Sequence, residues 1–117
     1  MADLFEAAEL AGIQLDNRIV RSATNTAFAG PDGHITDQLV DYLLDLVKGK
    51  VGLLITGHAF VSPEGRAGIQ QIGIYDDKFL PSLQMLTDRI HQGGGKIVVQ
   101  LAHSGCQAKN EMIGTTA

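Results

Sequence analysis

The chain has 117 residues, of which 44% are hydrophobic and 5% aromatic, and its formal net charge is −4 at pH 7. This length suits one domain, and the hydrophobic fraction excludes a wholly disordered chain. The negative charge and the scarcity of aromatic side chains argue against nucleic acid as the main partner.

Cysteine and histidine usage excludes further classes of protein. Cys106 is the single cysteine, so an internal disulfide and a paired-cysteine zinc site are both excluded. The four histidines show no metal-ligand spacing, and we expect no metal. The acidic start has no basic-then-apolar leader pattern, and no apolar run approaches a membrane span. We therefore expect a soluble, cytoplasmic protein without a membrane partner.

The first third of the chain predicts two short strands, a buried strand and a helix. Gly12 lies within residues 4–15 and predicts a turn between two short strands, which we expect to form a lid. Residues 18–25 are apolar first and polar last, which predicts a buried strand. Thr36 is a favourable N-cap and Gly49 a typical helix stop, and the apolar four-residue spacing between them predicts a helix.

The rest of the chain repeats this alternation. A continuous apolar run from Val51 predicts a second buried strand, which ends in small and polar residues before a long loop at 62–77. Asp76 or Asp77 is the expected cap of a second helix, and glycines at 93–95 end it. A third strand follows from Lys96.

The order β-α-β-α-β predicts an α/β fold with parallel strands joined by right-handed crossovers. Such a sheet needs cover on both faces and leaves two open edges here, so it is an unfinished domain. A complete (β/α)₈ barrel needs about 250 residues. We therefore expect residues 1–117 to be the N-terminal segment of one TIM-barrel domain, an incomplete barrel with a short N-terminal β-hairpin.

The polar ends of the three strands predict a ligand site, because parallel strands carry their ligands at the carboxyl edge. Gln100 lies inside the apolar third strand, so we expect its amide to be buried and either to bond neighbouring backbone or to face a planar ligand. His58 and His103 lie at strand ends, where a lone histidine is more often structural than catalytic. Ser22, Thr24 and Asn25 either cap the first strand or hold a ligand.

Seven blocks of sequence resemble the Old Yellow Enzyme family of NADH:flavin oxidoreductases and ene-reductases, in the family's order and spacing. They cover nearly the whole chain: Leu4-Phe5-Glu6, Asn17-Arg18-Ile19-Val20, Asp32-Gly33-His34-Ile35-Thr36, Val51-Gly52-Leu53-Leu54-Ile55-Thr56-Gly57, Ser62-Pro63-Glu64-Gly65-Arg66, Gly73-Ile74-Tyr75-Asp76 and Gln100-Leu101-Ala102-His103. The resemblance implies a TIM barrel that binds FMN at the carboxyl ends of its strands. It also implies a ping-pong reaction, in which NADH or NADPH reduces the flavin and the flavin reduces an activated alkene, another small-molecule acceptor or oxygen.

The resemblance assigns roles to particular residues. Asn25 takes the place of a residue that tunes the flavin through its carbonyl edge, and His58 aligns with a small residue whose backbone approaches the ring. Ala27 stands where many members carry a substrate-binding tyrosine. The residues implied to bind the cofactor are Ser22, Ala23, Thr24, Asn25, His58 and Gln100. No catalytic residue is implied within these 117 positions.

The family's later segments, which hold the substrate carbonyl and the FMN phosphate, have no counterpart in this sequence. We therefore expect this polypeptide alone to be inactive and to bind FMN weakly or not at all. The alternative is a non-catalytic half-barrel fragment that forms a homo-oligomer through its open sheet edges or pairs with a partner chain. A third and weaker alternative is an unrelated α/β binding module of flavodoxin-like type.

Overall fold

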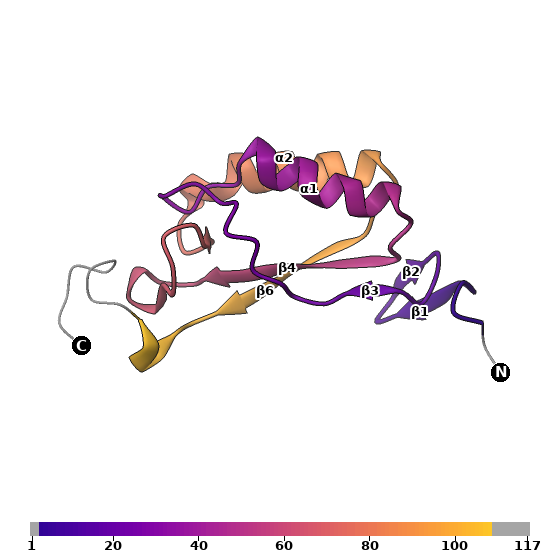
Figure 1. Ribbon diagram of the computed structural model, residues 1–117, viewed down its shortest axis with the longest axis horizontal. Coiled ribbons are helices and arrows are strands. Elements are labelled where there is room, and N and C mark those ends of the chain that lie inside the picture. The colour runs from indigo at the N-terminus through magenta and orange to yellow at the C-terminus, as the bar shows by residue number, and fades with distance from the viewer. Residues whose placement is uncertain (1–2, 109–117) are drawn as a thin grey trace.

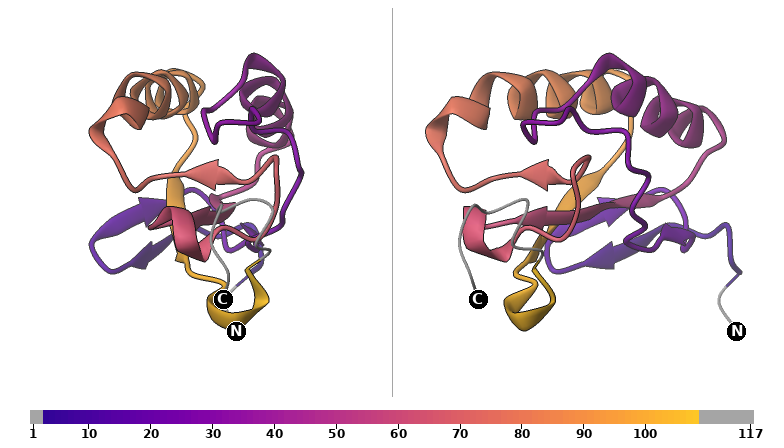
Figure 2. Two further views of the ribbon diagram at one scale, coloured as in Figure 1. Left: turned by 90° about the vertical axis from the view of Figure 1, so that its left-hand side faces the viewer. Right: turned by 60° about the vertical axis from the view of Figure 1, so that its left-hand side comes forward.

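The computed structural model describes residues 3–108 and forms two layers, with a parallel sheet covered on one face by two helices (Figure 1). The helices lie side by side over that face (Figure 2). An antiparallel hairpin precedes the sheet. The elements in chain order are β1 (Ala8–Leu10), β2 (Ile13–Leu15), β3 (Val20–Arg21), α1 (Asp37–Lys48), β4 (Leu53–Phe60), η1 (Pro63–Gly65), β5 (Ile72–Gly73), η2 (Asp77–Phe79), α2 (Leu80–Gln92), β6 (Ile97–Ala102) and η3 (Gly105–Gln107).

The central strand is β4, which pairs in parallel with β3, β5 and β6. Its pairing with β6 runs from Leu54 to Phe60 and occupies one edge of β4. The other edge is therefore shared, with β3 pairing at the start of β4 and β5 pairing at its end. This arrangement confirms the predicted α/β class and the parallel β-α-β-α-β order.

Helix α1 begins and ends where the sequence predicts, whereas α2 ends at the predicted glycines but begins at Leu80, after Phe79, which makes no side-chain cap. The Thr36 side chain accepts a hydrogen bond from the Leu39 backbone N–H at 3.2 Å and caps α1, and Gly49 follows its last residue. The Asp76 side chain caps η2, which leads directly into α2. Each helix turns an apolar stripe toward the sheet, and Val40, Leu54 and Ile90 are fully buried between the layers.

Two expectations about strands are wrong in detail. The first strand forms only two residues of ladder, Val20 and Arg21, and residues 22–25 continue beside β4 without strand pairing. The loop at 62–77 contains a strand that the sequence did not predict. This strand, β5, pairs with the last two residues of β4, beyond the point where β3 ends. Two residues are too short a run to give a periodic pattern.

The hairpin forms at the predicted place but is not a lid over the carboxyl ends. Ala11 and Gly12 make its turn with φ of 51° and 84°, a left-handed conformation that glycine adopts without cost. Figure 1 shows β1 and β2 beside the amino ends of β3 and β4. Buried Asn17 ties this end to the sheet, since its side chain donates to the Lys50 carbonyl and accepts from the Ile19 N–H.

A core substitution tests this packing. Replacing Ile90 by Val removes one methyl group from a fully buried side chain, and we expect a loss of about 1 kcal/mol in the free energy of unfolding. The matched control is Ile69→Val, because Ile69 is 60% exposed and should change stability little. Urea unfolding followed by circular dichroism measures both values, and equal losses would contradict the assignment of Ile90 to the core.

Candidate functional site

The register of β4 against β6 shifts by one residue between Ile55 and His58. Thr56 and Gly57 together stand opposite the single residue Val99, which makes a β-bulge. A bulge leaves backbone groups without ladder partners and re-aims the side chains that follow it. Its place near the carboxyl end of β4 is where a ligand site was expected.

The Thr56 side chain replaces the hydrogen bonds that the bulge removes from the ladder. Its hydroxyl accepts from the Gln100 backbone N–H at 3.2 Å and donates to the Gly57 carbonyl at 2.8 Å. Thr56 is buried, so these backbone groups would otherwise be left unpaired away from water. The hydroxyl therefore fixes the position of Gln100 relative to the end of β4.

The bulge also decides which face His58 occupies. Leu54 and Ala59 both belong to the core cluster beneath the helices. Successive strand residues point to opposite faces, so His58 lies on the face away from the helices. Its register partner Gln100 shares that face, because partners in neighbouring strands point the same way. The two predicted site residues are thus neighbours on one surface.

Residues 22–25 pass close to the bulge. A Cβ added at Gly57 would lie 2.8 Å from the Thr24 carbonyl oxygen and 3.1 Å from the Asn25 Cα. The absence of a side chain at Gly57 is therefore what allows this segment to approach β4. Thr24, Asn25 and His58 line one small cavity of about 10 Å³ together with Leu39 and Leu43 of α1, and it has room for about one water molecule.

Two amide side chains beside the site are oriented by backbone contacts. The Asn25 side-chain oxygen accepts from the Ala27 N–H at 3.2 Å, so its NH₂ group remains available as a donor. The buried Gln71 side chain accepts from the Ala67 N–H at 2.6 Å and lies 3.3 Å from His58 Nδ1 through its nitrogen. Both side chains therefore present their NH₂ groups away from the backbone that holds them.

The structure brings four predicted residues together, namely Thr24, Asn25, His58 and Gln100. Ser22 and Ala23 precede them on the same extended segment, and Ala27 follows on an exposed turn with φ of 56°. The expectation of a buried Gln100 amide is wrong, because Gln100 is exposed on the face that carries no helix within residues 3–108.

His103 has a structural place. Its ring packs against Gly65, where an added Cβ would lie 2.5 Å from the imidazole, and its Nδ1 accepts from the Gly105 N–H. The Ser104 N–H donates to the Gly65 carbonyl, which joins the end of β6 to η1.

Sequence reasoning missed two residues of the site, Thr56 and Gln71. In the sequence, Thr56 looks like any other β-branched residue of a buried strand. Its hydroxyl accepts from the Gln100 N–H only because the register shifts at this position. Gln71 lies in a loop where its neighbour Gln70 is equally polar but exposed. A signal for Gln71 was its position directly before the apolar pair Ile72 and Gly73.

Charged groups in the loops brace one another. The His34 backbone N–H donates to the Asp32 carboxylate and lowers the pKa of that group. The pKa of Lys78 is raised, chiefly by its contact with Tyr75. Arg66 extends over the Phe60 ring and donates to the carbonyls of Gly68, Pro31 and Ile69, so it braces its loop rather than facing the strand ends. Within residues 3–108 there is no group of three potential metal ligands.

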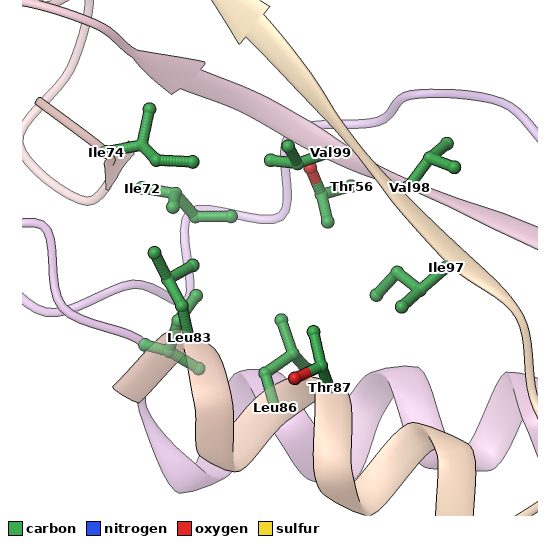
Figure 3. A pocket seen from close by; sticks show the side chains of 10 residues that line it. Thr56, Ile72, Ile74, Leu83, Leu86, Thr87, Ile97, Val98 and Val99 are labelled. Atoms are coloured by element: carbon green, nitrogen blue, oxygen red, sulfur yellow. The ribbon is translucent and has the colours of Figure 1, made fainter. Parts of the chain in front are cut away.

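The larger cavity, of about 270 Å³, lies elsewhere in the fold. Figure 3 shows its lining between α2 and the sheet, with side chains from both layers converging on it. Thr56 and Thr87 are its only two lining residues that are not aliphatic. The cavity belongs to the apolar layer under α2 and lacks the polar groups that orient a ligand, so the smaller polar site at the strand ends is the candidate functional site. The described part of the chain contains no helix able to cross a membrane.

Comparison with known sequences gives the family. A sequence model of the NADH:flavin oxidoreductase / NADH oxidase family matches residues 3–117. The chain is 34% identical to a metal reductase of Desulforamulus reducens over 118 residues, covering 100% of this chain and 17% of that protein. It is 35% identical to an NADPH dehydrogenase of Bacillus licheniformis, covering 92% of this chain and 32% of that protein. The chain belongs to the NADH:flavin oxidoreductase / NADH oxidase family.

Solved structures agree with this assignment. An Old Yellow Enzyme from Pichia sp. AKU4542 matches with a TM-score of 0.88 and 26% identity, over 95% of this chain and 29% of that one. An Old Yellow Enzyme homologue from Zymomonas mobilis matches in fold with a TM-score of 0.90 and 24% identity, over 98% of this chain and 32% of that one. The fold is therefore that of the N-terminal portion of an Old Yellow Enzyme TIM barrel, and the chain spans a third or less of each of these relatives.

Thr56→Val tests the role of the hydroxyl in the bulge. Valine keeps the shape but leaves the Gln100 N–H without its acceptor and the Gly57 carbonyl without its donor. We expect a loss of about 1–3 kcal/mol in the free energy of unfolding. Thr87→Val is the control, because that hydroxyl only returns to a carbonyl of its own helix. Equal effects of the two substitutions would contradict the bulge assignment.

Gly57→Ala tests the approach of residues 22–25. The new methyl group would meet the Thr24 carbonyl oxygen at 2.8 Å, so the segment must move, at a cost of about 1–3 kcal/mol. We expect amide chemical shifts to change at Thr24 and Asn25 in heteronuclear NMR spectra. Gly68→Ala is the matched control, since an added Cβ there meets nothing within 4 Å. Unchanged Thr24 and Asn25 signals in the Gly57 variant would show that the segment does not contact β4.

Proposed function

We propose that this chain supplies part of the FMN site of an Old Yellow Enzyme-type oxidoreductase, as the N-terminal segment of a single barrel domain. Such an enzyme passes hydride from NADH or NADPH through FMN to an activated alkene or another small-molecule acceptor. Bound FMN supplies the redox chemistry, and the protein supplies orientation and electrostatics. Because reduced nicotinamides are made and used inside cells, the proposal places this activity in the cytoplasm.

One observation supports the proposal: Asn25 and His58 line one small cavity and His58 stands opposite Gln100, so residues that follow or end three separate strands meet at the carboxyl end of β4. A flavin ring is planar and presents carbonyl oxygens and an imide N–H along one edge. The exposed Gln100 amide has both donors and an acceptor, which suits that edge. The free NH₂ group of Asn25 suits a carbonyl oxygen. The residues present therefore fit the ring of FMN.

Four further predicted residues complete the surface in this proposal. Ser22, Ala23 and Thr24 form the extended segment that leads to Asn25, and this segment would lie along the ring. Ala27 would border the substrate side, where its methyl group leaves more room than a tyrosine. A donor such as Asn25 near the ring favours the form of the flavin that carries more negative charge.

Of the two outcomes that the sequence leaves open for this polypeptide alone, weak binding of FMN and no binding, the proposal commits to weak, specific binding. We expect FMN to shift the NMR signals of Asn25, His58 and Gln100, with a Kd on the order of 1 mM. The affinity is weak because the free energy of a few hydrogen bonds only slightly exceeds the entropic cost of association. AMP is the control ligand, because it carries a phosphate and an aromatic ring but lacks the flavin edge. Saturation with FMN that leaves all three signals unmoved would refute the proposal.

A second candidate is the non-catalytic half-barrel that pairs with another copy or another chain. It is favoured by β6, which within residues 3–108 pairs with β4 alone and exposes Val99 and Leu101. The same titration separates the two functions when light scattering is recorded in parallel. A half-barrel of this kind would form a stable dimer or larger assembly and leave the FMN-dependent signals at the strand ends unmoved.

A further inference from the structure

The contact between His58 and Gln71 fixes which ring nitrogen of His58 carries the proton. Gln71 is 1% exposed, and its side-chain oxygen lies 2.6 Å from the Ala67 nitrogen and 3.4 Å from the Gly68 nitrogen. Two backbone N–H groups point at this atom, so it must be the acceptor. The group 3.3 Å from His58 Nδ1 is therefore the NH₂ group, which only donates.

Because the Gln71 NH₂ group donates, His58 Nδ1 must accept, and the proton of the neutral ring is on Nε2. The Nε2 atom is buried, and no residue of the described range 3–108 offers it an acceptor. A buried donor without a partner costs about 1–3 kcal/mol. The fold thus orients an N–H group at the strand ends and leaves it unsatisfied.

The surroundings of His58 indicate what kind of acceptor completes this arrangement. The imidazole shares its face with the exposed Gln100 amide, and it shares its small cavity with the polar Thr24 and Asn25 and with the apolar Leu39 and Leu43 of α1. The cavity, of about 10 Å³, has room for about one water molecule. Because Nε2 is buried, a ligand lying across Asn25 and Gln100 would reach it through one water in this cavity, or directly after the residues that cover the ring shift.

We propose that His58 is a ligand-binding residue whose Nε2–H donates to an acceptor atom of the flavin ring, in an orientation set by Gln71. This inference rests on the proposed function and names an added contact within the same site. It also assigns Gln71 as a positioning residue, which acts on the ligand only through the His58 ring. The small residue that the family resemblance implies at this position has no side-chain donor.

Three substitutions at His58 separate the two ring nitrogens. His58→Gln places an amide nitrogen near the original Nε2 and keeps a donor there. His58→Asn reaches only to the original Nδ1 position, and His58→Ala removes both. We expect FMN to bind the parent chain and His58→Gln with Kd values within about twofold, and to bind His58→Asn and His58→Ala about fivefold more weakly, as expected for one lost hydrogen bond.

The measurement is the FMN titration by NMR, with urea unfolding of every variant to record its stability. A purely structural role for His58 would lower the stability of His58→Asn and His58→Ala while leaving their Kd values at the parent's. That outcome overturns the inference and leaves the proposed function intact. Failure of the parent chain itself to bind FMN refutes the proposed function and the inference together.

The protonation of the ring is tested on the parent chain without any substitution. Nitrogen-15 NMR of labelled histidine distinguishes a protonated ring nitrogen from an unprotonated one. We expect Nε2 of His58 to be protonated and Nδ1 unprotonated, and we expect the Nε2–H signal to move downfield when FMN is added. The inference would be overturned by a proton on Nδ1, or by an Nε2–H chemical shift that stays unchanged when FMN binds.

Discussion

The candidate site depends on one extra residue in β4. A strand alternates its side chains between two faces, so an unbroken register would direct His58 toward the helices together with Leu54. An imidazole would then lie in the apolar layer, where a polar group without partners is costly. The bulge at Thr56 and Gly57 reverses the alternation once, which sends His58 to the polar face and keeps Ala59 in the core.

Around the strand ends, polar side chains use some of their hydrogen-bonding atoms to hold the fold in place. The Thr56 hydroxyl uses its donor and an acceptor site to hold the bulge. Asn25 uses its oxygen on its own turn, and His58 uses Nδ1 on Gln71. In Asn25 and His58, one polar atom of the side chain is bonded within the fold, and the other polar atom is a donor without a partner of its own among residues 3–108. The scaffold thereby determines both the direction and the chemical type of what the surface offers a ligand.

The apolar layer under α2 and the polar side chains at the strand ends lie in different parts of the fold. The larger cavity lies between α2 and the sheet and is lined almost wholly by aliphatic residues, as Figure 3 shows. The smaller cavity lies beside the carboxyl end of β4, where Thr24, Asn25 and His58 line it together with Leu39 and Leu43 of α1. Membership of the NADH:flavin oxidoreductase / NADH oxidase family accounts for this separation, because TIM barrels pack their strands and helices on apolar layers and carry chemistry in the loops that follow the strands.

The sequence by itself determined the elements, their order and the family. Four-residue apolar spacing defines both helices locally, with a cap at Thr36 for α1 and one at Asp76 for the short helix η2 that leads into α2, and continuous apolar runs define β4 and β6. Only the tertiary structure decided the bulge, the two-residue strand β5 and the contact of Gln71 with His58. These features depend on pairing between residues far apart in the chain, and pairing register leaves no periodic trace in either strand alone. For the same reason the sequence could name Asn25, His58 and Gln100 but could not say which of their atoms remain available to a ligand.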